Sequence, residues 1–362
     1  GETDSDQVDT DTLYAGQWAA SGAQELWNQL TPETREQLNR WGITDFSSID
    51  FSSLSPGGTL EGLLGMLAEQ AATPLAAIGM VLGIVLLCSL MEGMRQTAGR
   101  GEAAHIFSLV GAAASYAAVL VPLAGCIQRV SEAVSSVSVF MTSFVPVYGG
   151  IMLAAGQAVS AASYQTIVLF VAELLTLLVG RVIVPCLVIS LALGLTGAVT
   201  PEMKLNAVSD WFHKGAAWLL TLTTSVFVGL LSIQGIVGAA ADSLSGRAIR
   251  FSLASFVPVV GGALSEAFNA VKGCLSLLRT TMGGGGVLTT ALIVLPPLLS
   301  CVAWAFCLSL CAMVAELFAL PALGGLLRAA QNVVKTLIGV LAACALFMIV
   351  ATTIVTVAGL HA

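Results

Sequence analysis

Two charged side chains in one apolar run are the first candidates for chemistry in this sequence. Glu173 and Arg181 lie eight residues apart, which on a helix is about two turns and near one face. That spacing is too long for a direct ion pair on a straight helix, so we expect a partner from another helix. A charge at the centre of a membrane helix costs at least ~2.5 kcal/mol, so each side chain should face protein or water. For Arg181 the alternative is an interfacial position, with the side chain reaching the lipid headgroups.

A second group of polar candidates follows residue 262. Glu266, Asn269 and Lys272 occur close together, and Arg279 comes shortly after them. A segment with these side chains is too polar to face lipid on all sides. We expect it to line a cavity or to re-enter the membrane as a half-helix.

A Phe-Val-Pro-Val-x-Gly-Gly motif occurs twice, and the second copy precedes this polar segment. Proline removes a backbone donor and breaks a helix, and paired glycines permit a sharp change of direction. Each copy therefore predicts a Pro-Gly-broken re-entrant segment or half-helix, although Pro and Gly can also kink a spanning helix. The predicted hinge residues are Phe144, Pro146, Gly149 and Gly150 in the first copy and Phe256, Pro258, Gly261 and Gly262 in the second.

The remaining reactive side chains do not form a pattern typical of an enzyme. After residue 73 the aspartates are Asp210 and Asp242, both in predicted polar connections, whereas an aspartyl intramembrane protease needs a pair on apolar runs. His105, His213 and His361 are scattered, without a nucleophile at an informative spacing. No His-Glu-x-x-His motif is present. We therefore predict a chain that is not an enzyme and uses no cofactor.

Two further motifs favour packing or flexibility over ligand binding. Cys307 and Cys311 share a helix face, but no His or acid at a suitable spacing completes a metal site, so no metal is expected. Met282 and the four glycines at 283–286 lack the Lys-Ser/Thr that would complete a phosphate-binding loop. The glycine run predicts a flexible hinge between helices.

Composition indicates that lipid covers most of the chain. Of 362 residues, 57% are apolar and 10% are charged, which is too few charges for the surface of a large soluble protein. Twelve acids and two bases lie in residues 1–73, so the formal charge of that segment is −10, whereas the rest carries +3. Nucleic acid is therefore not an expected partner. The acidic start at Gly1 is typical of a mature protein from which a secretory signal has been removed.

The elements that position these residues are all predicted to be helices. Thr31 should cap a helix that begins at Pro32 and ends at Gly42. Further apolar runs cover residues 74–91, 105–127, 164–195, 215–236, 287–318 and 336–360, each long enough to span a bilayer. Two of them exceed thirty residues, and Pro185 and the Pro296–Pro297 pair are their natural break points. Arg95 and Arg100 follow the first span, so the positive-inside rule places the N-terminus outside the cytoplasm.

An internal repeat organises the membrane part. The offset of 112 residues carries Phe144 onto Phe256 and Pro185 onto Pro297. The predicted fold is an all-α, polytopic membrane bundle with two repeats and a small extracytoplasmic helical segment. Its segments are residues 1–73 (acidic, extracytoplasmic), 74–104 (first transmembrane helix and cytoplasmic loop), 105–214 (repeat 1), 215–335 (repeat 2) and 336–362 (last transmembrane helix). Six or eight crossings, and parallel or inverted repeats, both remain open.

The second repeat also carries a resemblance to a known family. Ser232-Ile233-Gln234-Gly235, then Asp242, Arg247 and residues 256–261, resemble stage III sporulation protein AE, and residues 25–28 are loosely similar. The resemblance implies a multi-pass protein of the mother-cell membrane that surrounds the forespore of an endospore-forming bacterium. It also implies partners: other stage III sporulation membrane and ring proteins, a cytoplasmic secretion-type ATPase and, indirectly, a forespore membrane protein. Late forespore gene expression would depend on that assembly.

Three functions fit these expectations, and a transport conduit is the one that the sequence favours. The chain could form or gate a transport conduit in the channel apparatus, lined by its polar residues. It could instead be a membrane scaffold that anchors the ring proteins and the ATPase without conducting. The internal repeat also fits an unrelated secondary transporter, although the family motif argues against it.

Overall fold

The computed structural model describes residues 16, 18–19, 21–40, 43–45, 56–98, 102–199, 205–256, 261–318 and 320–360. Every regular element in these ranges is a helix, which confirms the all-α prediction. Six helical segments in them are long and apolar enough to cross a membrane. The polytopic prediction is therefore confirmed as well.

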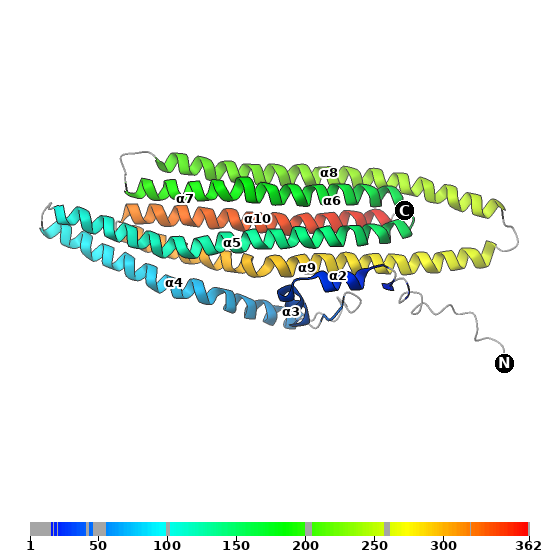
Figure 1. The fold of residues 1–362 in the computed structure, drawn as a ribbon, viewed down its shortest axis with the longest axis horizontal. Helices are drawn as coiled ribbons and strands as arrows, with labels where there is room; N and C mark the ends of the chain where they lie inside the picture. Colours follow the sequence, from blue (N-terminus) through cyan, green and yellow to red (C-terminus); the bar gives the residue numbers. More distant parts are fainter. Residues whose placement is uncertain are drawn as a thin grey trace.

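The long helices pack in one elongated bundle, in which α6 and α7 continue in one direction and the other successive helices are antiparallel (Figure 1). They are α4 (Pro56–Ala98), α5 (Glu102–Ala154), α6 (Ala158–Leu178), α7 (Val184–Val199), α8 (Leu205–Phe256), α9 (Gly261–Leu317) and α10 (Pro321–Leu360), with a short π-helical segment, η2 (Val179–Ile183), joining α6 to α7. Helix α10 packs against α5, α6, α7, α8 and α9 and so lies centrally. Helices α5, α8 and α9 have 53, 52 and 57 residues. At ~1.5 Å per residue each is far longer than the ~30 Å hydrocarbon core of a bilayer.

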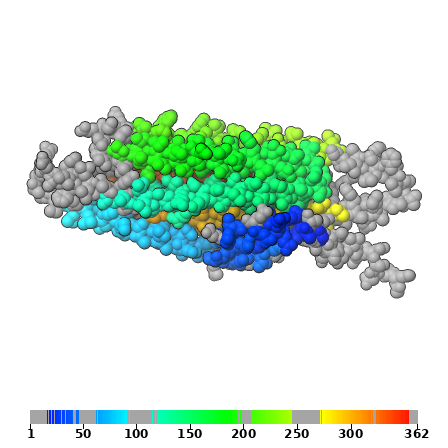
Figure 2. Space-filling model, viewed as in Figure 1, coloured from blue at the N-terminus to red at the C-terminus, as the bar shows by residue number. Residues whose placement is uncertain are grey.

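Two short helices near the N-terminus lie along the side of this bundle. Helix α2 (Ala23–Gln29) packs against α5, and α3 (Pro32–Arg40) packs against α9 (Figure 2). The backbone N–H of Thr34 donates to Oγ1 of Thr31 at 3.4 Å, which confirms the predicted start of α3. The predicted end at Gly42 lies outside the described residues.

The first motif copy does not break a helix, so that prediction is wrong. Helix α5 continues through Pro146, Gly149 and Gly150 and ends at Ala154. The chain then turns at Gly156, whose φ of 82° is in the left-handed region that glycine adopts most easily. Pro146 lies on the exposed side of α5, where a helix tolerates a proline more easily than in the packed core.

The second motif copy lies between two full-length helices. Helix α8 ends at Phe256 and α9 begins with Gly261 and Gly262, whereas Pro258 lies outside the described residues. These two helix ends lie beyond the turn between α5 and α6 (Figure 1). The helices on both sides of the motif exceed fifty residues, so neither is a half-helix. A helix does end and another begin at this motif, and a re-entrant path there stays a prediction.

The helices continue through the prolines at which breaks were predicted. Pro296 and Pro297 both lie inside α9. Just before Pro185, the N–H of Val184 donates to the carbonyl of Val179, five residues back, in the π-helical segment η2. A proline ring in a regular helix collides with the carbonyl four residues before it, and the wider turn removes that collision.

Candidate functional site at the α5–α6 turn

Aromatic side chains fill the bundle on one side of the α5–α6 turn. Phe140, Phe144 and Tyr148 repeat every four residues and therefore share one face of α5. The ring centroids of Phe140 and Phe144 lie 5.3 Å apart, and those of Phe144 and Tyr148 lie 5.4 Å apart. Tyr164 of α6 extends the row, 5.4 Å from Tyr148. Phe144 and Tyr148 are 0% exposed, so the first motif contributes to the core.

The aromatic row packs against the glycine run of α9 at residues 283–286. A Cβ atom added at Gly286 would lie 2.5 Å from Cζ of Phe144 and 2.7 Å from Cε of Met348 in α10. A Cβ atom at Gly283 would lie 3.2 Å from the hydroxyl oxygen of Tyr148. Because α9 continues through the run, the predicted hinge is wrong. The glycines form a flat helix surface against which large rings pack.

The two glycines of the first motif have different surroundings. A Cβ atom at Gly149 would overlap the side chain of Gln165 in α6, whose Cγ and Cδ atoms would both lie 2.7 Å away. A Cβ atom at Gly150 would have nothing within 4 Å. Gly149 therefore brings α5 and α6 close together, whereas Gly150 lies on an open surface.

A buried carboxylate from the second half of the chain caps helix α6. Asp242 of α8 is 4% exposed. Its Oδ1 accepts from the N–H of Val159 at 3.0 Å, and its Oδ2 accepts from the N–H of Ser160 at 3.0 Å. Gln157, the residue before α6, makes no side-chain cap of its own. A negative charge at a helix N-terminus satisfies free N–H groups and complements the helix dipole.

Helices α8 and α9 hold the same turn through two further contacts. A Cβ atom at Gly238 would lie 2.7 Å from Oγ of Ser160, so α8 approaches α6 closely beside the cap. In α9, Nη1 of Arg279 donates to Oε1 of Gln157 at 2.7 Å. Arg279 is 6% exposed, and its Nε and Nη2 atoms have no hydrogen-bond partner. The turn is therefore fixed by an acid and a base from two different helices.

The predicted intramembrane charges do not join this cluster. Glu173 of α6 and Arg181 of η2 are both exposed on the outer surface of the bundle. In the part of the chain that the structure describes, neither has an ion-pair partner. Glu266, Asn269 and Lys272 are residues of α9, but their side chains lie outside the described part.

Two further polar contacts, one of them made by His213, lie nearer the opposite end of the bundle. Oε1 of Glu316 lies 2.7 Å from Nη2 of Arg328, where α9 is followed by α10. Oγ1 of Thr336 lies 2.9 Å from Nδ1 of His213. Among the described residues, no group of three His, Cys, Asp or Glu side chains could hold a metal ion. These contacts join neighbouring helices.

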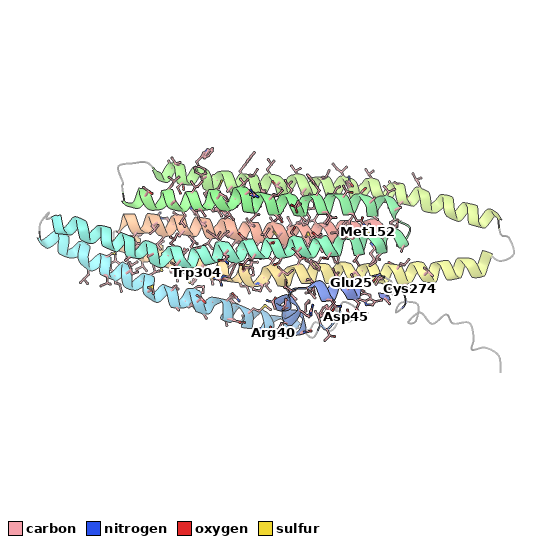
Figure 3. The ribbon with its side chains drawn as sticks, in the orientation of Figure 1. Glu25, Arg40, Asp45, Met152, Cys274 and Trp304 are labelled. Atoms are coloured by element: carbon pink, nitrogen blue, oxygen red, sulfur yellow. The ribbon has the colours of Figure 1, made fainter. Side chains whose placement is uncertain are left out.

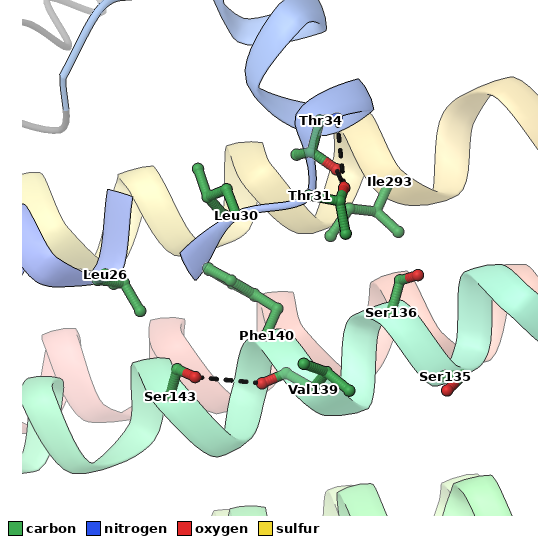
Figure 4. A pocket seen from close by; sticks show the side chains of 10 residues that line it. All are labelled: Leu26, Leu30, Thr31, Thr34, Ser135, Ser136, Val139, Phe140, Ser143 and Ile293. Carbon is green, nitrogen blue, oxygen red and sulfur yellow. Dashed lines mark hydrogen bonds between the residues drawn. The ribbon is translucent and has the colours of Figure 1, made fainter. Parts of the chain in front are cut away.

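A small cavity separates α2 and α3 from the bundle (Figure 4). Its volume is about 120 Å³, and its wall combines hydroxyl groups with apolar side chains such as Phe140 and Ile293. Three of its five hydroxyl groups have local partners. Thr31 bonds Thr34 at 2.7 Å, and Ser143 donates to the carbonyl of Val139 at 3.5 Å. The polar wall is therefore largely satisfied without a ligand.

Sequence reasoning placed Asp242 in a polar connection, whereas it is a buried residue of α8. A lone aspartate in a small-residue stretch, four residues after Gly238, was the available signal. The partners of Asp242 are 82 and 83 residues away in sequence. The same end of the core includes Met152, whereas Trp304 lies well along the bundle toward the other end (Figure 3).

The chain matches one protein family over most of its length. The family described as stage III sporulation protein AE matches residues 43–359. The stage III sporulation protein AE of Bacillus subtilis (strain 168) is 24% identical over 350 residues, which cover 93% of this chain and 85% of that protein. No solved structure matches the chain. The matched region includes both motif copies, Asp242 and all six apolar spans, and on this basis the chain belongs to the stage III sporulation protein AE family.

Proposed function

We propose that this chain is a membrane scaffold of the sporulation channel apparatus that connects mother cell and forespore. In this role the helical bundle anchors the ring proteins and the secretion-type ATPase in the mother-cell membrane. It performs no catalytic turnover and uses no cofactor. Its acidic N-terminal segment faces away from the cytoplasm, as the arginines after the first span indicate.

The filled core at the first motif is the observation that carries the scaffold role. Phe144 and Tyr148 are fully buried against the glycine surface of α9. A path for solute through this part of the bundle would have to displace both rings. Charged side chains on the outer surface, Glu173 and Arg181, are in the place expected for contacts between subunits.

A gated conduit is the second candidate, and Arg279 favours it. A buried guanidinium with two nitrogen atoms lacking partners is costly unless water or an anion reaches it. In this case the cluster at the α5–α6 turn opens, water reaches Arg279, and the aromatic row closes the path at rest.

A measurement of solute release from lipid vesicles distinguishes the scaffold role from the conduit role. The purified chain is placed in lipid vesicles that contain a small fluorescent anion, and release is compared with release from protein-free vesicles. A scaffold gives no added release, while deletion of the chain in sporulating cells removes the ATPase and the ring proteins from the membrane fraction. Release by the chain alone, abolished by Arg279→Gln, would instead establish the conduit.

Orientation is tested separately by a reporter. Alkaline phosphatase fused after residue 60 should be active, because this enzyme folds only outside the cytoplasm. Activity from a cytoplasm-specific reporter at the same junction would overturn the assignment of the N-terminal segment.

A further inference from the structure

The exposed charges of α6 and η2 occupy a surface that is otherwise suited to lipid. Around them, Phe170 is 64% exposed, Leu174 is 40% exposed and Leu177 is 48% exposed. Glu173 and Arg181 project from the same outer surface without an ion-pair partner in the part of the chain that the structure describes. Unpaired charges on an apolar membrane surface are costly, and such residues usually meet a polar partner.

Helix α5 presents a polar exposed stripe directly beside this surface. Its exposed residues are mostly polar and include Gln128, Arg129, Glu132, Ser135, Val139 and Thr142. Within this group, Oε1 of Glu132 accepts from Nε2 of Gln128 at 2.9 Å. By contrast, the exposed side of α8 consists mainly of large apolar residues, Ile236 among them. The surfaces of α5 and α6–α7 lie side by side on the face shown in Figure 2. Small and polar residues at such a surface are typical of helices that pack against another membrane helix.

The contact between Gly149 of α5 and Gln165 of α6 is a reference point for comparing positions along the axes of these two helices. Because α5 and α6 run in opposite directions, equal steps from this contact reach the same level. Sixteen residues, or about 24 Å, lead from Gln165 to Arg181 and from Gly149 to position 133, next to Glu132. An exposed base and an exposed acid thus lie at one level on neighbouring helices.

Two copies of a membrane protein inserted in the same orientation can be related by a two-fold axis parallel to their helices. Such an axis keeps every residue at its own level and brings α5 of one copy against α6–α7 of the other. Arg181 of each copy then meets Glu132 of the other, so the interface has two equivalent ion pairs. Glu173 lies level with position 141, next to Thr142, so it meets no like charge across the axis, whereas the exposed Arg129 lies about one turn from the level of Arg181.

We propose that a second copy of this chain covers the α5–α7 face, held by reciprocal ion pairs between Arg181 and Glu132. The pairing gives the exposed charges that support the scaffold role a specific partner, but it concerns how two copies meet and not what they anchor, so either can fail without the other. In the assembled dimer the charges are removed from lipid, which explains why an apolar surface carries them.

Charge exchange tests the pairing in the full chain, purified in detergent and returned to lipid nanodiscs. Arg181→Glu alone and Glu132→Arg alone should each weaken dimerisation roughly tenfold or more, as measured by mass photometry over a dilution series. The double variant, Arg181→Glu with Glu132→Arg, should dimerise as the unchanged chain does. A double variant as weak as the single ones, or single variants with no effect, would overturn the proposal.

Cysteine crosslinking checks the geometry without reversing any charge. Two differently tagged chains, with the native cysteines replaced by alanine, carry Glu132→Cys and Arg181→Cys respectively. Under mild oxidation, their coexpression should give a covalent dimer of twice the chain mass, whereas Trp218→Cys on the exposed side of α8 should not pair with either. Crosslinking only to a chain of different mass, or no dimer at all, would contradict a second copy as the occupant.

Discussion

Replacing Gly286 by alanine should destabilise the bundle, although alanine is the better helix former. The added Cβ would lie 2.5 Å and 2.8 Å from two ring atoms of Phe144 and 2.7 Å from Cε of Met348. Carbon atoms in ordinary contact are ~3.5–4.0 Å apart, so the ring must move by about 1 Å. Phe144 is fully buried in a stacked row and has little room to do so. Overpacking of this kind costs ~1–3 kcal/mol, and the helix propensity of alanine returns up to ~1 kcal/mol.

The net expected loss for Gly286→Ala is therefore about 1–2 kcal/mol in the free energy of unfolding. Gly273→Ala is the matched control, because Gly273 is in the same helix and a Cβ there would have nothing within 4 Å. The control should be neutral or stabilising by up to ~1 kcal/mol. Both variants are unfolded in detergent micelles by a denaturing detergent, with loss of helical circular dichroism as the signal.

A second substitution identifies the cause of the loss. Phe144→Leu removes the outer ring atoms, so Gly286→Ala should cost much less in that background, and the double-mutant cycle should give a favourable coupling. If Gly286→Ala proves as stable as Gly273→Ala, the packing of Phe144 against the α9 glycines is refuted. A loss that is unchanged by Phe144→Leu would show that the added methyl group meets something other than the ring.

Three further outcomes follow from the α5–α6 turn and its neighbours. Gly150→Ala should be neutral or mildly stabilising, whereas Gly149→Val should lower membrane levels and spore yield because the added side chain collides with Gln165. Equal effects of the two substitutions would contradict the close contact of α5 with α6. Asp242→Ala should cost ~1–2 kcal/mol of stability, since it leaves two partly buried N–H groups at the start of α6 without their acceptor. Ser243→Ala is its control, and equal stability of the two variants in the same unfolding assay would refute the cap. Cys126 of α5 and Cys301 of α9 are both buried and lie close enough for their thiols to interact. A chain with only these two cysteines should therefore form an internal disulfide on mild oxidation, and free thiols in both after treatment would refute their proximity.

Helix starts and membrane spans were predictable wherever a single short stretch of sequence is enough to specify them. Thr31 followed by Pro32 predicted the start of α3, and the structure has both the cap and the helix there. The uncharged run before Glu92 predicted the first span, which the structure places in α4. Length and apolarity are sufficient for these predictions, because in lipid an apolar segment satisfies its backbone by forming a helix.

Predictions that assigned Pro and Gly a fixed meaning were less successful. Pro146 and Pro297 were expected to end or break helices, yet both lie within long ones. The glycines at 283–286 were expected to be flexible, yet two of them are surfaces for Phe144 and Tyr148. Glycine weakens an isolated helix, but in a bundle it also permits close approach, and neighbouring helices decide which effect dominates.

The sequence by itself determined that the chain is an all-helical, multi-pass membrane protein, and its motifs indicated the family. These properties depend on composition, on run lengths and on short sequence patterns. Tertiary structure alone decided that Asp242 caps α6, that Arg279 donates a hydrogen bond to Gln157 and that Phe144 packs against Gly286. Each of these contacts joins residues from different helices, more than eighty positions apart in the chain. Only the packing of the bundle brings them together, because no local rule of helix formation specifies which faces meet.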